Sequence, residues 1–271
     1  MAANLREFPG ITAPVTAATL MEAAQLDPEL TRSDDGDEEF ERMPVVRIKR
    51  QLGLLQVPAM APLQIIVHHE LAAKHLPTLM RMYRDSSIPN NAAMMLINSV
   101  SHTPYFVRFL QLAENADVCV IHARRTAYAT FSAVPPHDLA DTVAETCQFL
   151  STLLVLQNTV GLAAEDKLAL TRKLRAWSQQ YRNKFAEEVS ERALMLLGPR
   201  VGETASIVNV VRTQLEKGIS HCKARNCDLT GQNNGGELLM CSKCRTVRYC
   251  GAQHQRQDWP SHKKVCFTPA F

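Results

Sequence analysis

The chain has 271 residues, which is enough for one substantial domain and a small second one. Its apolar fraction of 46% supports a hydrophobic core, and its 21% of charged residues is ordinary for a soluble protein. A net charge of +3 is too small to indicate nucleic-acid binding by itself.

The first residues lack the apolar core of a signal peptide. The most apolar stretch, residues 149–164, contains several polar residues and is shorter than the roughly 20 residues that a membrane helix needs. We interpret it as a buried helix and expect no membrane association. Without a secretion signal, we expect an intracellular protein, in the nucleus or the cytoplasm. In such a reducing compartment, cysteine clusters bind metal more often than they form disulfides.

Residues 1–42 are expected to form a mobile, acidic N-terminal segment outside the core. Prolines and glycine interrupt its beginning, and only residues 16–25 fit one short helix. Acidic residues crowd the following stretch: Asp27, Glu29, Asp34, Asp35, Asp37, Glu38, Glu39 and Glu41. Such a block is typical of a solvated segment, and an acidic interaction tail is the alternative.

Residues 43–218 are expected to form a helical domain. Apolar periodicity predicts helices over residues 63–84, 91–114, 118–131, 139–157, 165–197 and 204–217. The clearest stripe lies in residues 165–197 and consists of Leu170, Leu174, Trp177, Tyr181, Phe185 and Val189. Pro77 and Pro104 are expected to kink or end their helices. Strand-like alternation is scarce, with weak candidates at residues 45–48 and around Gln56.

The predicted fold class is therefore mainly α, as a helical bundle or a short stack of helical hairpins. No fixed sequence period identifies a named repeat. Cys119 and Cys147 lie among apolar neighbours and are predicted to be small core residues. His68 and His69 would point about 100° apart on a helix, so we interpret them as surface or satisfied core histidines rather than joint metal ligands.

The strongest signal in the sequence is a cluster of cysteines and histidines at residues 219–271, which we expect to form a separate small domain. Eight potential metal ligands occur there in four ordered pairs: Cys222 and Cys227, Cys241 and Cys244, Cys250 and His254, and His262 and Cys266. Eight thiol and imidazole ligands are enough for two four-coordinate zinc ions. The last two pairs have the i, i+4 spacing that places two side chains on one face of a helix.

The cluster is predicted to hold structural zinc. Few sizeable apolar residues lie between residues 222 and 266, too few for a core that folds without metal. Because protein side chains fill all eight positions, no coordination site is left for a catalytic water. The same segment carries eight Lys and Arg against three acids, a mildly basic surface that suits protein contacts better than DNA.

Two stretches of this cluster resemble the MYND-type zinc finger. They are Cys-Ser-Lys-Cys-Arg-Thr-Val-Arg-Tyr-Cys at residues 241–250 and Gln-Arg-Gln-Asp-Trp-Pro-Ser-His-Lys-Lys-Val-Cys at residues 255–266. The resemblance covers about a fifth of the chain and implies a two-zinc cross-brace. The first zinc would be bound by Cys222, Cys227, Cys250 and His254, and the second by Cys241, Cys244, His262 and Cys266.

Two positions depart from the family pattern. Four residues separate Cys222 from Cys227 where the family usually has two, and His254 stands where it mostly has cysteine. Imidazole is a competent zinc ligand, so we expect the site to survive. His221, beside Cys222, is a rival ligand.

MYND fingers of known function bind short proline-containing peptides, and the resemblance assigns peptide contacts to Ser242, Gln255 and Trp259. An aromatic face suits proline rings, and an amide side chain can bond an extended backbone. The alternative is that Trp259 packs the small core and Gln255 is an ordinary surface residue. Some family members are SET methyltransferases, but these split a mostly β domain around the finger, whereas here the remainder is helical.

We therefore hypothesise a non-enzymatic adaptor with a helical scaffold and a peptide-binding finger. One alternative is an enzyme with an unrecognised site in residues 43–218, which a deep polar pocket with perturbed acids would favour. Common catalytic motifs are missing from the sequence. The other alternative is a nucleic-acid-associated regulator using the basic finger, which salt-dependent DNA binding would support.

Overall fold

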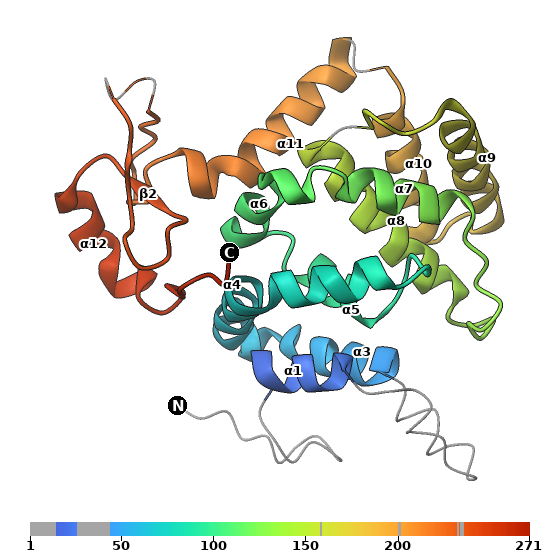
Figure 1. Ribbon diagram of the computed structural model, residues 1–271, viewed down its shortest axis with the longest axis horizontal. Coiled ribbons are helices and arrows are strands. Elements are labelled where there is room, and N and C mark those ends of the chain that lie inside the picture. The colour runs from blue at the N-terminus through green and yellow to red at the C-terminus, as the bar shows by residue number, and fades with distance from the viewer. Residues whose placement is uncertain (1–14, 26–43, 158, 200–201, 232, 234–235) are drawn as a thin grey trace.

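The computed structural model describes residues 15–25, 44–157, 159–199, 202–231, 233 and 236–271. Within these residues it is mainly helical and ends in a small finger, which confirms the predicted fold class (Figure 1). The helices are α1 (Ala17–Ala24), α3 (Pro44–Leu55), α4 (Ala61–Asp85), α5 (Ala92–Ser99), α6 (Pro104–Leu110), α7 (Val118–Ala127), α8 (Leu139–Leu156), α9 (Ala164–Gln180), α10 (Phe185–Leu197), α11 (Gly202–Ser220) and α12 (Ala252–His262). Strands β1 (Leu239–Met240) and β2 (Arg248–Tyr249) and the 3-10 turns η2 (Pro58–Met60) and η3 (Ala113–Asn115) complete the elements.

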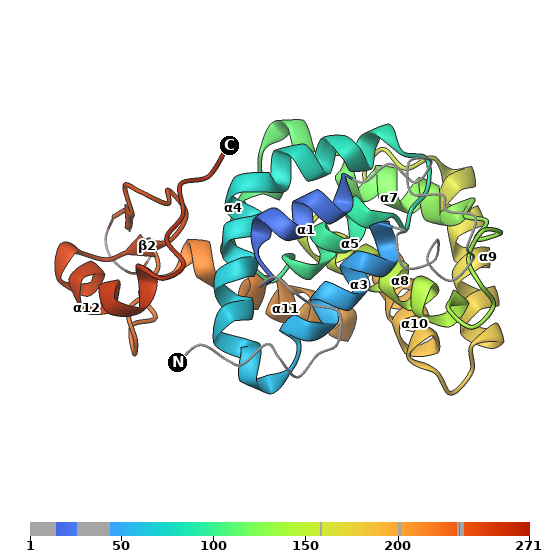
Figure 2. The same cartoon turned by 90° about the horizontal axis from the view of Figure 1, so that it is seen from below.

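The helical domain consists of two packed groups of helices. In one group α1 packs on α3 and α4, while α5 packs on α3 and α4. In the other, α10 packs on α8 and α9, and α7 packs on the same two helices. Contacts between α5 and α8 join the groups, and α11 runs from the second group toward the finger (Figure 1). The view from below shows the finger to one side of the helical domain, reached by α11 and followed by the C-terminal tail (Figure 2).

The prediction of one long helix over residues 165–197 is wrong. The chain forms the hairpin of α9 and α10 instead, with a turn at Tyr181–Lys184. Asn183 in this turn has φ 64°, a left-handed conformation that asparagine tolerates and a helix interior does not. Its N–H is bonded to the side chain of Glu187, 2.6 Å away. The apolar stripe crosses the turn, and Phe185 is consequently 53% exposed.

The helix predicted over residues 91–114 is also divided, into α5 and α6. The Thr103 hydroxyl accepts the N–H of Phe106 and caps α6, with Pro104 at its first position. Proline suits this position because the first N–H of a helix has no intrahelical partner. Pro77, by contrast, lies inside α4 and does not end it.

The first group contains two departures from the sequence analysis. Residues 45–48, a weak strand candidate, belong to α3, which buries Ile48 and Leu55. Residues 1–42 were expected to lie outside the core, yet α1 buries Leu20 and Met21 and begins with a capping box formed by Thr16. The alternation at residues 45–48 covers only four residues, which is too few to distinguish a strand from one face of a helix. The acidic stretch of residues 27–41 lies outside the described residues.

Helix α8 is apolar enough to cross a membrane by length and composition, with a mean hydropathy of 1.3, but 61% of it is buried inside the protein. It packs most extensively against α10 and also contacts α7, α5 and α11. Residues 149–156 therefore form part of a buried helix, as expected, whereas the rest of the predicted apolar stretch lies beyond its end. Cys119 and Cys147 are fully buried, which confirms them as core residues.

A buried histidine joins three helices at the centre of the domain. His122 of α7 is fully buried, and its Nδ1 lies 2.7 Å from the hydroxyl of Tyr83 in α4. Its Nε2 lies 3.0 Å from the carbonyl oxygen of Thr146 in α8. Burial lowers the pKa of His122 from 6.5 to about 4, so the ring stays neutral at physiological pH.

The C-terminal tail attaches the finger to the helical domain. The hydroxyl of buried Tyr105 donates to the carbonyl oxygens of Val265 and Phe267, at 3.0 and 2.9 Å, and accepts the N–H of Phe267. The N–H of Ala270 donates to the carbonyl oxygen of Ala73, 2.9 Å away. These bonds fix the finger through residues on both sides of its last metal-ligand candidate, Cys266, and through the tail that follows.

Side chains reinforce this attachment. The rings of Phe271 and Phe109 meet edge to face with centroids 4.9 Å apart, and the Arg108 guanidinium lies 5.5 Å from the Phe271 centroid. At the other end of the finger, α11 packs on α6, where a Cβ on Gly218 would lie only 3.1 Å from the Pro104 side chain. Glycine at this position permits the close approach of the two helices.

His122 gives stability a pH dependence. The unfolded chain binds this proton near pH 6.5 and the folded chain near pH 4, so the stabilisation is complete above pH 6.5 and is lost as pH falls toward 4. We expect this histidine to lower the free energy of unfolding by up to about 1.4 kcal/mol per pH unit in that window. Denaturant unfolding of wild type and His122→Phe over this pH range should show a shallower slope in the variant. His137→Ala, at a largely exposed position, should keep the wild-type slope.

Removal of the Tyr105 hydroxyl should loosen the finger. We expect Tyr105→Phe to lose about 1–3 kcal/mol of stability, because each net hydrogen bond contributes about 0.5–1.5 kcal/mol. The Phe267 amide should exchange hydrogen faster, which NMR can measure. Tyr128→Phe, which removes a bond to Asp166 between α7 and α9, is the matched control and should leave that amide protected. Unchanged exchange in Tyr105→Phe would mean that the tail is held by other contacts.

Candidate metal centre

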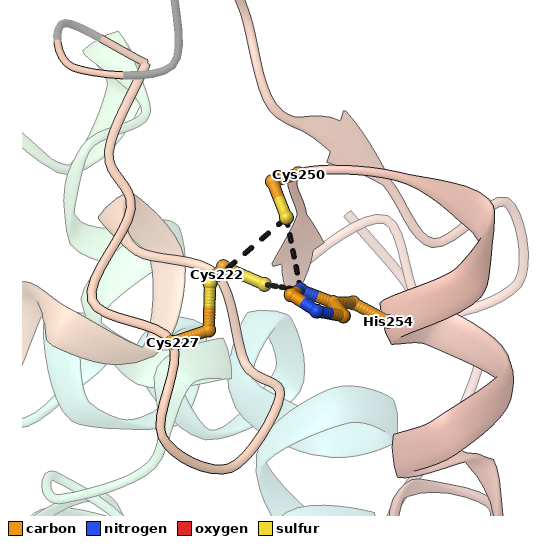
Figure 3. A group of neighbouring side chains, drawn as sticks. All are labelled: Cys222, Cys227, Cys250 and His254. Carbon is orange, nitrogen blue, oxygen red and sulfur yellow. Dashed lines mark hydrogen bonds between the residues drawn. The ribbon is translucent and has the colours of Figure 1, made fainter.

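The eight predicted ligands form two tetrads. In one, the ligand atoms of Cys222, Cys227, Cys250 and His254 all lie within 4.8 Å of one another, and their side chains converge in Figure 3. In the other, the same holds for Cys241, Cys244, His262 and Cys266. The first and third pairs along the chain share one tetrad, and the second and fourth share the other. This is the cross-brace that the resemblance implied.

The interatomic distances fit tetrahedral zinc. The Sγ atoms of Cys227 and Cys250 are 3.9 Å apart, and those of Cys241 and Cys266 are 3.8 Å apart. Two sulfurs bound at about 2.3 Å to a tetrahedral ion lie about 3.8 Å from each other, far beyond the roughly 2.05 Å of a disulfide. The sulfur of Cys244 lies 3.6 Å from Nε2 of His262, a spacing that also suits one shared ion.

A short hairpin and one helix position the ligands. Strands β1 and β2 pair antiparallel, with Leu239 opposite Tyr249, so Cys241 and Cys250 directly follow the two strands. His254 lies in the first turn of α12, and His262 is its last residue. The i, i+4 pairs were predicted to lie on helical turns, but each instead spans one end of α12. The helix therefore separates the two tetrads and carries one imidazole to each.

The turn after Cys241 is arranged around its sulfur ligands. The N–H of Arg245 donates to the carbonyl oxygen of Cys241, at 2.8 Å, and Arg245 has the left-handed φ of 50°. The buried Thr246 hydroxyl donates to the carbonyl oxygen of Cys244, at 2.7 Å. Such a knuckle directs both sulfurs of a Cys-x2-Cys pair to one side.

The thiols are tuned by burial and by backbone donors. Burial raises the pKa of the Cys222 thiol, but the N–H groups of Cys250 and Ala224, together with the side chains of His254 and Cys227, outweigh this effect and lower the pKa to about 7. For Cys266, burial and the neighbouring Cys244 and Cys241 sulfurs raise the pKa to about 12. Several thiolates this close together need a cation to offset their repulsion. The donor set of three thiolates and one imidazole in each tetrad fits two structural zinc ions, each giving a site charge of about −1.

The rival ligand and the departures from the family pattern are accommodated locally. His221 lies outside the tetrads, and its Nδ1 is 2.8 Å from the Ser220 hydroxyl. His254 places its Nδ1 3.5 Å from the Cys222 sulfur and 2.9 Å from the Cys250 sulfur. Cys227 reaches the tetrad despite its longer spacing from Cys222, over a loop in which Asn226 has φ 59°.

The predicted peptide-contacting residues lie on two segments of the finger, the turn after Cys241 and helix α12. Ser242 is exposed between Cys241 and Cys244, and Gln255 and Trp259 lie one turn apart on α12. The Trp259 ring meets the His262 ring edge to face at 5.9 Å and remains 41% exposed. The indole thus has both a packing contact and a free face. No contact among the three is described, so their joint role stays a prediction.

Leu239 and Met240 are two of the few sizeable apolar residues of the finger. Both are exposed, by 56% and 49%, on the two-residue strand β1. Leu238, directly before them, is buried instead. A strand this short gives too little alternation to predict which face is buried.

Comparison with known proteins assigns the finger. A family model described as MYND finger matches residues 220–266. Human Egl nine homolog 1 is 52% identical over 40 residues, covering 15% of this chain and 9% of that protein. The Rho GTPase-activating protein gacZ of Dictyostelium discoideum is 40% identical over 45 residues, or 17% of this chain and 3% of that protein.

A third relative is human histone-lysine N-methyltransferase SMYD3, which is 47% identical over 30 residues, or 11% of this chain and 7% of that protein. The chain thus matches less than a tenth of the length of each of these three relatives, and two of their names describe different activities. No solved structure matches. The shared property is the finger itself, and the MYND finger is a known protein-interaction module.

Metal analysis tests whether the two tetrads bind zinc. We expect two zinc ions per chain by elemental analysis, and Cys244→Ser should lower zinc content and unfold the finger, because structural zinc contributes about 10–16 kcal/mol per site at neutral pH. Cys119→Ser, which changes a cysteine outside the finger, should retain both ions. A chain with one zinc or none would contradict the assignment.

Proposed function

We propose that this chain, with a MYND finger at residues 220–266, is a non-enzymatic adaptor that captures a proline-containing partner peptide. The proposal rests on one observation: the indole of Trp259 is exposed on a helix whose two ends contribute ligands to the two tetrads. Protein side chains fill all four coordination positions at each metal site. The ions therefore support the structure of the finger and do not act on a substrate.

The shape of the finger supports peptide capture. Trp259 offers an aromatic face for a proline ring, and Gln255, one turn earlier on α12, offers an amide for an extended backbone. Leu239 and Met240 of β1 are further exposed apolar side chains on the finger. In the described residues β1 pairs only with β2, so its other edge has unpaired backbone groups suited to an extended segment.

The helical domain has the role of a scaffold in this proposal. The Tyr105 bonds and the packing of Phe271 on Phe109 hold the finger in one orientation. A fixed finger loses less conformational freedom on binding than one on a flexible linker, which favours affinity. An intracellular, reducing location suits the thiolate ligands, and we include it in the proposal.

Peptide binding tests this function. We expect Trp259→Ala to weaken binding of a proline-containing peptide at least about tenfold, because buried aromatic anchors dominate such contacts. Gln255→Ala should weaken it less. Isothermal titration calorimetry measures both effects, and zinc content must remain at the wild-type level in each variant.

Gln253→Ala is the matched control, since this exposed glutamine lies on α12 about half a turn away from Gln255. It should bind as wild type does. A peptide in which alanine replaces proline should lose affinity for the wild-type chain. Equal affinity of Trp259→Ala and wild type would remove the peptide site from the finger.

A further inference from the structure

The helical domain contains a polar cavity that lies apart from the tetrads. Its volume is about 360 Å³, and it is lined from α3, α4, α5, α8 and the connections after α3 and α5. Leu52 and Met95 supply apolar wall, and three glutamines, Gln56, Gln64 and Gln148, supply amide groups. This volume is at the lower end of the range of about 300–1,000 Å³ that is typical of small-molecule sites.

The feature that sets this cavity apart is His68. Its side chain lies in the cavity wall and the residue is only 4% exposed, yet neither ring nitrogen has a hydrogen-bond partner. The other buried histidine of the helical domain, His122, has both ring nitrogens bonded. Because a buried, unpaired polar group costs about 1–3 kcal/mol, His68 is held at an energetic cost that a bound partner would offset.

A second unpaired group faces the same space. Oδ1 of Asn98 is buried without a partner and also belongs to the lining. The ring of His102 lies 5.2 Å from that of His68, centroid to centroid, and gives the cavity an aromatic wall. Burial lowers the pKa of His68 to about 4, so the neutral ring offers one N–H donor and one nitrogen acceptor.

The charges restrict the ligand. Glu145 in the lining forms an ion pair with Lys49 at 3.7 Å and accepts a bond from Asn90 at 3.1 Å. Burial raises the pKa of Glu145, but these two contacts already engage its carboxylate, so we infer binding rather than acid–base catalysis. An anion would face this carboxylate and the Asn98 oxygen and is therefore disfavoured.

A metal ion also fits poorly. Among the described residues, no third ligand atom from His, Cys, Asp or Glu lies near enough to form a metal group with His68 and His102. A purely apolar ligand would leave the His68 nitrogens and Asn98 Oδ1 unpaired. The remaining class is an uncharged molecule that both donates and accepts hydrogen bonds.

We propose that this cavity binds a small, planar, uncharged molecule with N–H donors beside a carbonyl or ring-nitrogen acceptor, the chemical class of nicotinamide and the nucleobases. One edge of such a molecule pairs with one ring nitrogen of His68 and donates an N–H to Asn98 Oδ1. Its faces lie against the His102 ring and the apolar side chains of Leu52 and Met95. The site is independent of peptide capture by the finger.

NMR of the full-length, zinc-loaded protein tests this site, with nicotinamide, cytosine and adenine as separate probes. We expect one of them to shift the imidazole carbon-bound proton signals of His68 and His102 in a saturable manner, while the exposed His137 does not respond. His68→Phe keeps the ring and removes the hydrogen bonds, so it should bind that probe at least about tenfold more weakly.

Gln148→Ala provides a second variant, because this exposed rim residue can change without disturbing the core. It should also weaken binding, whereas Trp259→Ala in the finger should bind the probe as wild type does. Two results would overturn the proposal. One is the absence of saturable shifts at millimolar concentrations of every probe, which would leave water as the only occupant. The other is wild-type affinity in both cavity variants.

Discussion

The fold of the finger depends on its two ligand tetrads, each of which gathers three thiolates and one imidazole around a zinc ion. Its hairpin has two residues in each strand, and α12 carries few buried residues, so packing alone holds little of it together. Cys241 and Cys250 follow the strands, while His254 and His262 occupy opposite ends of α12. The metal ligands thus connect elements that make few other contacts. Trp259 lies on α12 between the two imidazole ligands, so the same arrangement fixes the position of its half-exposed ring.

The orientation of the finger rests on a different set of interactions. The hydroxyl of Tyr105 bonds the main chain at residues 265–267, directly beside the ligand Cys266. Phe271 then packs on Phe109, and Gly218 brings α11 close to α6. The tail and α11 therefore hold the finger from both of its ends. The helical domain acts through these contacts as a base that holds the finger in one orientation.

The ability to predict the structure from the sequence differed between the two regions. The ligand pairs of the finger were predictable because zinc imposes fixed residue types within a few residues of each other, and the resemblance supplied their interleaving. The helix boundaries at Asn183 and Thr103 were not, because an apolar stripe continues across each turn and does not show where the backbone changes direction. Helix α1 was missed as part of the core, because the short apolar pattern around Leu20 stands beside a strongly acidic stretch.

The sequence by itself determined that the chain is mainly helical, that eight cysteine and histidine residues form metal-ligand pairs, and which pairs the MYND resemblance brings together. These properties follow from local spacing and side-chain chemistry. Only the tertiary structure decided that α12 bridges the tetrads, that Tyr105 holds the C-terminal tail, and that His68 is buried in a polar cavity without a partner. Each of these joins residues far apart in the chain, and their proximity is set by packing, which no local pattern records.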